Sequence, residues 1–349
     1  MKETHSSILL SVCLLAAATG LLLVPQEVSG AVRDGLSVCT NTLLPTLFPF
    51  MILSGIFVRS GLVQHIGNNA EKLMRTLFHL PGVCFSALLF GMIGGYPTGA
   101  KTVVSLYQSG SCSKNEAEHA LAFCNNCGPG FLISGIGFGL FQNIRCGILL
   151  FAIHIVSAVF TGIVLAPPTK VVSTKKSSNT DSGNSISFCF VTSVTDAMAS
   201  YLNLCAFVLC FSAILVLVEC SGIPALLAHF LPCSKENGTW FLLGYLEITG
   251  GIFHLTAGTV SERFLLISVL AAWGGLSVHC QVISLLQGTD LSPIPYLKGK
   301  AFHSIFACLL AYALVTGIPV LPYSIVGIVS AAVLGRLKKR SGNTSKSVL

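Results

Sequence analysis

The stretch Gly94-Gly95-Tyr96-Pro97-Thr98-Gly99 lies in the middle of an apolar segment long enough to enter a membrane. Its glycines and its proline lower helix propensity and remove a backbone donor, so they predict a break in a helix. A second polar break, Asn125-Asn126-Cys127-Gly128-Pro129-Gly130, interrupts the next apolar segment. Hydrocarbon cannot satisfy the backbone groups that such breaks free, so we expect both breaks to line a cavity or a binding site.

The second half of the chain repeats this pattern. Gly244–Gly251 reads GYLEITGG, and Trp273–His279 reads WGGLSVH, again within apolar segments. Paired breaks in two halves of one chain are typical of transporters built from internal repeats. The sequence therefore predicts a transporter with its binding site where the breaks meet.

Composition assigns the chain to the membrane proteins. Of 349 residues, 53% are hydrophobic and only 9% are charged, and the mean hydropathy is +0.80. Soluble domains are about a quarter charged. The formal net charge of +7 comes from residues in short loops and at the C-terminus. That distribution sets membrane orientation, and it argues against a nucleic-acid partner.

The 14 cysteines do not indicate a metal or a cofactor. Most lie within apolar runs, where a thiol behaves as a small hydrophobic group. Cys124 and Cys127 form a CxxC pair, but no second pair or histidine follows at zinc-site spacing. The chain also lacks a P-loop and the common hydrolase motifs, so we expect no enzyme and no cofactor.

The apolar segments predict an all-α polytopic membrane protein with about eight spans and two re-entrant hairpins. The hairpins are residues 84–107 and 239–258, which carry their breaks near the middle. The predicted spans are residues 7–24, 42–59, 117–141, 145–166, 200–219, 264–288, 301–319 and 320–335.

The basic residues orient these segments. With the N-terminus in the cytoplasm, nearly every basic cluster falls on the cytoplasmic side. These residues are Lys72, Arg75, Lys114, Lys170, Lys175, Lys176, Lys298, Lys300, Arg336, Lys338, Lys339 and Arg340. Both termini are then cytoplasmic. The hairpins open to opposite sides, as in two inverted-topology repeats.

This topology divides the chain into five parts. We expect an N-terminal span and loop at 1–34, a first repeat at 35–167, a polar cytoplasmic linker at 168–187, a second repeat at 188–320, and a last span with a basic tail at 321–349. The first apolar segment is long for a signal peptide and favours a retained span, although Val28-Ser29-Gly30 also fits a cleavage site. Cleavage stays open.

The first break supplies one group of candidate binding residues. Gly95, Tyr96, Thr98 and Gly99 form the predicted hairpin tip, where bare N–H groups and a hydroxyl would face a ligand. The alternative is a tight helix-packing site, because small residues also let membrane helices approach. Lys101 is a cation within a membrane segment, which marks function unless its side chain reaches the interface.

The second break adds two adjacent amides. Asn125 and Asn126 are costly in an apolar segment unless they are paired. A half-helix beginning near Gly130, after Gly128, would present free N–H donors and partial positive charge to an anion. The alternative is an amide clamp between helices.

The second half contributes a carboxylate. Glu247, beside Thr249, must be protonated, paired or bound to a cation at this depth, and it is the candidate for the coupling ion. The alternative is a structural ion pair with Lys101 or a histidine. Ser277 and His279 follow the last break, together with Gln281, but all three share a cavity only if the chain is unwound there.

Four motifs carry a resemblance to a known family. Gly91–Lys101 (GMIGGYPTGAK), Phe123–Gly130 (FCNNCGPG), Tyr245–Gly251 (YLEITGG) and Trp273–Gln281 (WGGLSVHCQ) resemble the YlbJ-type (stage V) sporulation integral membrane proteins. Each half is similar to the Gate, or nucleoside-recognition, domain of that family, which is related to concentrative nucleoside transporters. The resemblance implies an endospore-forming bacterium, the outer forespore membrane, and movement of dipicolinic acid from the mother cell.

The resemblance also implies site residues and partners. It places Thr98, Asn125, Asn126, Glu247, Thr249 and Ser277 at the site. The hairpin has Pro97-Thr98 where nucleoside transporters carry an acidic residue. We therefore expect a small anionic substrate, a coupling proton or sodium ion, and the lipid bilayer as partners. Homo-oligomerisation stays open. The alternatives are a transporter of nucleosides or other small molecules, and a non-transporting scaffold for spore assembly.

Overall fold

The computed structural model describes residues 2–167 and 186–318, which are helices and connecting loops without a strand. In the first half the helices are α1 (Lys2–Leu23), α2 (Pro25–Val38), η1 (Cys39–Leu43), α3 (Leu44–Arg59), α4 (Leu62–Leu77), α5 (Cys84–Gly94), α6 (Thr98–Gln108), α7 (Lys114–Cys124), η2 (Gly130–Leu140) and α8 (Ile144–Val164). In the second half they are α9 (Ile186–Cys220), α10 (Ile223–Leu227), η3 (Ala228–Phe230), α11 (Lys235–Gly244), α12 (Ile248–Phe253), α13 (Val260–Trp273), α14 (Gly275–Leu286) and α15 (Ile294–Thr316).

The described residues include four helices that are long and apolar enough to cross a membrane. These are Ile144–Val164, Ser187–Cys220, Val260–Leu286 and Ile294–Thr316. Two bent pairs, Leu14–Leu23 with Pro25–Leu43 and Leu47–Arg59 with Leu62–Leu77, raise the count to six if each pair is one span. The all-helical membrane class is confirmed. The count of eight spans is not, and the predicted span 320–335 and most of the linker 168–187 lie outside the described residues.

All four predicted breaks are present. The chain leaves helical geometry between α5 and α6, between α7 and η2, and between α11 and α12. Between α13 and α14 it turns at Gly274, whose φ of 95° lies in the left-handed region that favours glycine. The predicted span 117–141 is broken at residues 125–129, where its polar motif predicted a break. It consists of two eleven-residue helices, α7 and η2, joined by an extended segment.

The order of elements repeats between the halves. A helical hairpin, a broken helix and a long helix follow one another as α5–α6, α7–η2 and α8, and again as α11–α12, α13–α14 and α15. In each hairpin the two arms pack against each other. This order agrees with two repeats. Their inversion across the membrane stays a prediction.

Glycines let the broken segments approach closely. The Cα atoms of Gly91 in α5 and Gly99 in α6 both face the carbonyl group of Cys124, with no room for a side chain. In the α11–α12 hairpin Gly251 faces the backbone of Gly244 with equally little room, and a side chain at Gly244 would meet Leu270 of α13. Small residues permit such packing in a membrane, where helices gain little from hydrophobic burial. The glycines thus bring the breaks of each half together.

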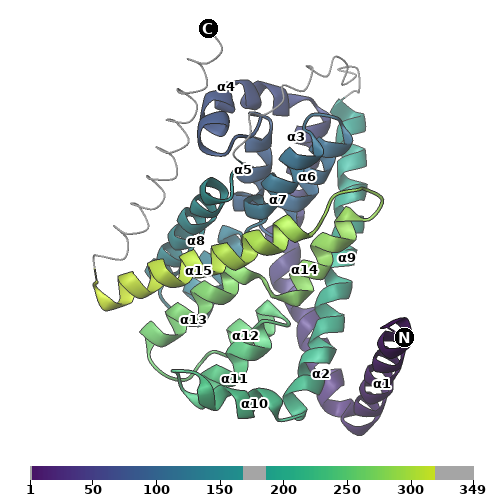
Figure 1. Cartoon of the computed structure of the whole chain (residues 1–349), viewed down its shortest axis with the longest axis vertical. Coiled ribbons are helices and arrows are strands. Elements are labelled where there is room, and N and C mark those ends of the chain that lie inside the picture. Colours follow the sequence, from purple (N-terminus) through teal and green to yellow (C-terminus); the bar gives the residue numbers. More distant parts are fainter. Residues whose placement is uncertain (1, 168–185, 319–349) are drawn as a thin grey trace.

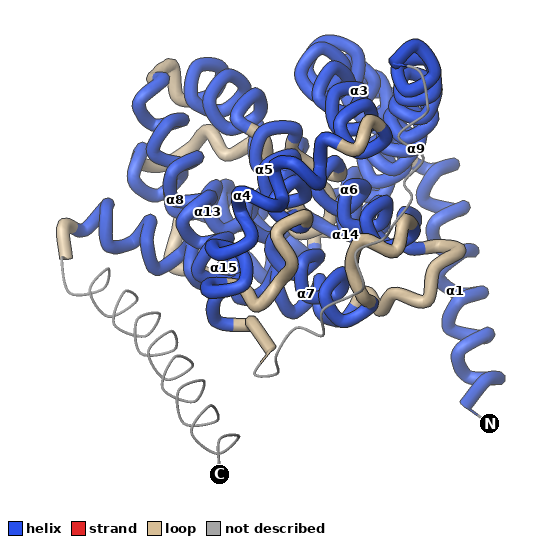
Figure 2. Tube along the Cα trace, turned by 90° about the horizontal axis from the view of Figure 1, so that it is seen from above, coloured by secondary structure: helices blue, strands red, loops and turns tan. Residues whose placement is uncertain are grey.

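The long helices hold the two halves together. Helix α15 of the second half packs against α7 and α8 of the first as well as against α13. Helix α9 runs along the length of the molecule, where it packs against α2, α3 and α14 (Figure 1). It begins at Ile186, well before the predicted span 200–219. Helix α1 lies at the edge of the bundle, where it contacts only α2 and α9 to any extent among the described helices (Figure 2).

Candidate functional site

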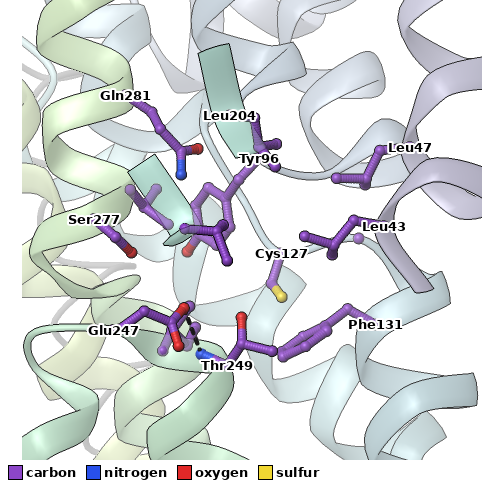
Figure 3. Close-up of a pocket in the computed structure, with 14 residues that line it drawn as sticks. Leu43, Leu47, Tyr96, Cys127, Phe131, Leu204, Glu247, Thr249, Ser277 and Gln281 are labelled. Carbon is purple, nitrogen blue, oxygen red and sulfur yellow. Dashed lines mark hydrogen bonds between the residues drawn. The ribbon is translucent and has the colours of Figure 1, made fainter. Parts of the chain in front are cut away.

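A small cavity of about 50 Å³ lies where the four breaks meet (Figure 3). Its volume is below the roughly 300–1,000 Å³ of ordinary small-molecule sites, so an organic substrate would need the cavity to widen. Each break contributes lining residues, and η1, α3 and α9 supply an apolar wall. The lining residues are Leu43, Leu47, Tyr96, Cys127, Gly128, Phe131, Leu204, Val208, Glu247, Ile248, Thr249, Ser277, Val278 and Gln281. We call this space the central cavity.

Among residues 2–167 and 186–318, Glu247 is the only charged residue that lines the central cavity. It caps helix α12, where its two carboxylate oxygens accept hydrogen bonds from Thr249 N at 2.9 Å and from Gly250 N at 2.5 Å. A carboxylate at a helix N-terminus is stabilised by those N–H groups and by the helix dipole. These N–H groups are therefore already engaged within the protein.

Helix α14 presents two polar side chains to the cavity, one turn apart. Ser277 and Gln281 both line it, and both are buried. The Ser277 hydroxyl and the Gln281 carbonyl oxygen have no hydrogen-bond partner within the described residues. At the start of the same helix, Leu276 N donates to Tyr245 O and Ser277 N to Leu246 O. Backbone carbonyl groups freed by the α11–α12 break thus accept hydrogen bonds from N–H groups at the α13–α14 break.

His279 does not belong to the central cavity, contrary to the prediction. Because α14 is a regular helix, His279 faces away from Ser277 and Gln281. Its Nδ1 lies 2.9 Å from the Tyr296 hydroxyl, and its ring packs edge-on against Trp273. Ser277, His279 and Gln281 could share a cavity only if this stretch were unwound, and it is helical.

The predicted first-half residues divide between the cavity and its supporting wall. Tyr96 and Gly128 line the cavity, and Gly95, with a φ of 75°, packs against Gly128. Gly99 contacts the Cys124 carbonyl instead. Thr98 is fully buried, and its hydroxyl has no partner among the described residues. Gly130 begins η2, as expected for the half-helix.

Asn125 and Asn126 lie behind the wall rather than on it. Asn126 Nδ2 donates to Phe123 O at 2.8 Å, while its amide oxygen has no partner in the described part of the chain. The Asn125 amide lies beside Tyr296 but completes no hydrogen bond within that part. Buried amides left open in this way are rare in proteins. These open amide atoms indicate a position where water or a ligand supplies the missing hydrogen bonds.

Lys101 lies in a different cavity, so neither its predicted place in the site nor its alternative pairing with Glu247 is found. Its ammonium group donates to Asp196 O at 3.0 Å and to Ser200 Oγ at 2.7 Å, both on α9. The cavity there has a volume of about 340 Å³ and also contains Arg59, which forms an ion pair with Asp196. We call this space the basic vestibule.

A third cavity lies at the other side of the central one. Its volume is about 710 Å³, and it shares Val208, Glu247 and Thr249 with the central cavity. Glu27, Asp34 and Glu219 add carboxylates to its wall. We call it the acidic vestibule. Residues of α9 line the basic vestibule near Asp196, the central cavity at Leu204 and Val208, and the acidic vestibule up to Cys220.

Sequence reasoning missed Lys300. Counted as a cytoplasmic loop lysine, it is 1% exposed and lies within α15. Its ammonium group contacts Tyr96 Oη at 2.9 Å, Asn125 O at 3.2 Å and His303 Nδ1 at 3.4 Å. The spacing of Tyr296, Lys300 and His303 places them on one helix face, and this pattern is the signal that would have found them.

His154 on α8 completes the cluster around Lys300. Its Nε2 accepts a hydrogen bond from Cys127 N at 2.9 Å, and its backbone carbonyl lies 3.0 Å from His303 Nε2. The first contact satisfies a backbone group freed by the α7–η2 break. The histidine therefore stabilises the break directly behind the central cavity.

Comparison with known proteins bears on this geometry. Residues 41–166 match the Gate family, described as nucleoside recognition. The chain is also 27% identical over 318 residues to the sporulation integral membrane protein YlbJ of Bacillus subtilis (strain 168), an alignment that covers 81% of this chain and 76% of that protein. No solved structure matches. The resemblance predicted from the four motifs is confirmed, and this is an integral membrane protein similar to YlbJ.

Proposed function

We propose that this protein is a membrane transporter that moves a small planar anion, dipicolinate, from the mother cell across the outer forespore membrane during sporulation. The central cavity carries the proposal. It lies at the junction of four helix breaks, and polar atoms without a partner among the described residues point to it or lie directly behind its wall. Polar, irregular backbone at membrane depth is found where it lines a cavity, and transporters bind substrates there.

The three cavities support transport over a scaffold role. They follow one another along α9, and the central and acidic cavities share wall residues. A scaffold has no need of such a series. In the proposed path, Arg59 and Lys101 attract the anion into the basic vestibule, since positive charge raises the local concentration of anions. By the predicted topology this vestibule opens toward the mother-cell cytoplasm.

Charge in the central cavity supports coupling to a cation. Glu247 faces this cavity and the acidic vestibule. Each carboxylate oxygen accepts one backbone hydrogen bond, which leaves lone pairs for a proton or a sodium ion. A cation bound there would neutralise the carboxylate before a dianion arrives. We propose Glu247 as the coupling group on this basis.

A nucleoside is the second candidate substrate. The Gate match is described as nucleoside recognition, and Ser277 and Gln281 offer hydrogen-bonding groups beside the aromatic ring of Tyr96. The apolar wall from Leu43, Leu47 and Val208 would also accept a base or a ribose ring. The cavity would then bind an uncharged molecule.

Uptake into liposomes tests the proposal. Purified full-length protein is reconstituted, and radiolabelled dipicolinate and uridine are supplied outside, with and without an imposed proton or sodium gradient. We expect saturable dipicolinate uptake that a cation gradient accelerates. Protein-free liposomes are the control for leakage. Uridine uptake without dipicolinate uptake would favour the second candidate. If neither compound is taken up, both proposed transport functions are contradicted.

A further inference from the structure

Lys300 is a buried cation without a buried anion beside it. The ion pairs of the described residues are Arg59–Asp196, Arg75–Glu71, Lys114–Glu118 and Lys114–Asp290. None involves Lys300. A charge at membrane depth is costly unless it is compensated, so a lysine placed here without a carboxylate requires a reason.

The surroundings of Lys300 satisfy its hydrogen bonds but not its charge. An ammonium group has three N–H donors. They meet three neutral acceptors, which are the Tyr96 hydroxyl, the Asn125 carbonyl and His303 Nδ1. His303 can accept at Nδ1 because its Nε2 faces the His154 carbonyl, which only accepts. The site thus holds an ammonium group in place and leaves one positive charge uncompensated.

Tyr96 connects this charge to the central cavity. Its side chain lines the cavity, while its hydroxyl accepts the hydrogen bond from Lys300. The Lys300 ammonium also lies 4.9 Å from the centre of the Tyr96 ring. The Tyr96 hydroxyl donates to Ala271 O at 2.8 Å. The single proton of this hydroxyl is thus engaged by a backbone carbonyl, so the charge of Lys300 acts on the cavity through space, across Tyr96.

We propose that Lys300 is the counter-charge that makes the central cavity select anions, and that it acts across Tyr96, whose hydroxyl holds the ammonium behind the cavity wall. The inference rests on the proposed function and adds the residue that sets its substrate class. Glu247, taken alone, would repel a carboxylate from the cavity. Lys300, behind the Tyr96 wall, offsets that repulsion, and a carboxylate of the substrate supplies the negative charge that Lys300 lacks.

The expected size of the effect is large enough to measure. At an effective dielectric constant of about 20 and a separation of about 8 Å, the attraction of two unit charges corresponds to a roughly 30-fold change in affinity. Removal of the charge should therefore reduce the selectivity for an anion by about tenfold or more. A merely structural lysine would lower the rates for charged and uncharged substrates together.

The test compares two substrates of the same shape. Uptake of dipicolinate and of its uncharged diamide, pyridine-2,6-dicarboxamide, is measured in liposomes that contain wild-type protein, Lys300→Met, Lys300→Arg or Tyr96→Phe. Wild-type protein should prefer the dianion. Lys300→Met should lose that preference by about tenfold or more while still carrying the diamide, and Lys300→Arg should retain it. Lys298→Met, an exposed position on the same helix, is the matched control and should behave like wild type.

Tyr96→Phe keeps the inference testable if Lys300→Met does not fold. It deletes one of the three acceptors that hold the ammonium beside the cavity wall, so the preference should fall part of the way. A wild-type anion-to-diamide ratio in Lys300→Met, or in Tyr96→Phe if that variant alone folds, would overturn the inference while dipicolinate transport stands. Wild-type liposomes that carry only the diamide would contradict the proposed function instead.

Discussion

Glu247 combines a structural task with the proposed coupling role. Glu247→Gln mimics the protonated carboxylate, but the amide retains only one acceptor oxygen. Loss of one of its two cap hydrogen bonds should cost about 1 kcal/mol of stability. We expect the variant to fold, to bind dipicolinate and to lose its dependence on an ion gradient in liposome uptake. Fully gradient-driven, wild-type uptake would rule out the coupling role.

Lys101→Met is the matched control for that variant. The Lys101 ammonium bonds to Asp196 and Ser200 rather than to Glu247. Addition of Lys101→Met to Glu247→Gln should therefore restore neither the stability nor the gradient dependence of uptake. The single Lys101→Met variant should raise the substrate concentration needed for half-maximal uptake, because the basic vestibule loses one of its two cations.

Asn125 and Asn126 should be required for transport rather than for folding. Their amides have buried atoms without a partner within the described residues, so a ligand or its water is the expected partner. We expect Asn125→Ala and Asn126→Ala to abolish uptake with near-normal amounts of protein. Asn126→Ala should be the less stable of the two, by about 1 kcal/mol, because it also loses the hydrogen bond to Phe123 O. If activity falls only as protein is lost, both amides are structural clamps.

At the scale of elements, sequence predicted the breaks and misjudged what lies between them. Glycine and proline change local backbone preferences, so their effect could be predicted at Gly94–Gly99 and at Gly274. The break at residues 125–130 was predicted in the same way, but the extended backbone between α7 and η2 was not, because hydropathy does not report backbone direction. Lys300 was likewise assigned to a loop, because the predicted span began at residue 301. In the structure α15 begins at Ile294, and Lys300 is buried within it.

The α5–α6 hairpin should depend on glycine where it meets α7. A methyl group at Gly99 would overlap the Cys124 carbonyl, which is backbone and cannot move aside. Overpacking of this kind costs about 1–3 kcal/mol or more. We expect Gly99→Ala to lower the thermal unfolding temperature clearly in detergent. Gly30→Ala, where a methyl group meets nothing within 4 Å, should leave it unchanged. Equal stability of the two variants would contradict the hairpin packing.

At the scale of the molecule, two halves with the same order of elements enclose one site. The predicted candidates Tyr96, Gly128, Glu247, Thr249 and Ser277 come from both halves and line one cavity. Sequence could predict this much because each half carries its own pair of breaks. It could not predict that Lys101 would face α9 or that His279 would face Tyr296, because both outcomes depend on how distant helices pack.

Membrane orientation remains a prediction of the charge distribution. Position 175 in the linker and the basic tail after Arg336 should both be cytoplasmic, a result that does not depend on Lys300. Labelling of single-cysteine variants with a membrane-impermeant reagent checks this in cells and in inverted vesicles. Labelling of position 175 from the outside only would contradict the arrangement of two inverted repeats.

Equilibrium binding of radiolabelled dipicolinate to purified full-length protein tests the central cavity most directly. We predict saturable binding with one molecule per chain. Ser277→Phe should abolish it by filling the cavity, and the exposed control Lys298→Met should not change it. Absence of saturable binding to the wild-type protein, or unchanged binding to a folded Ser277→Phe variant, would contradict the assignment of this cavity as the substrate site.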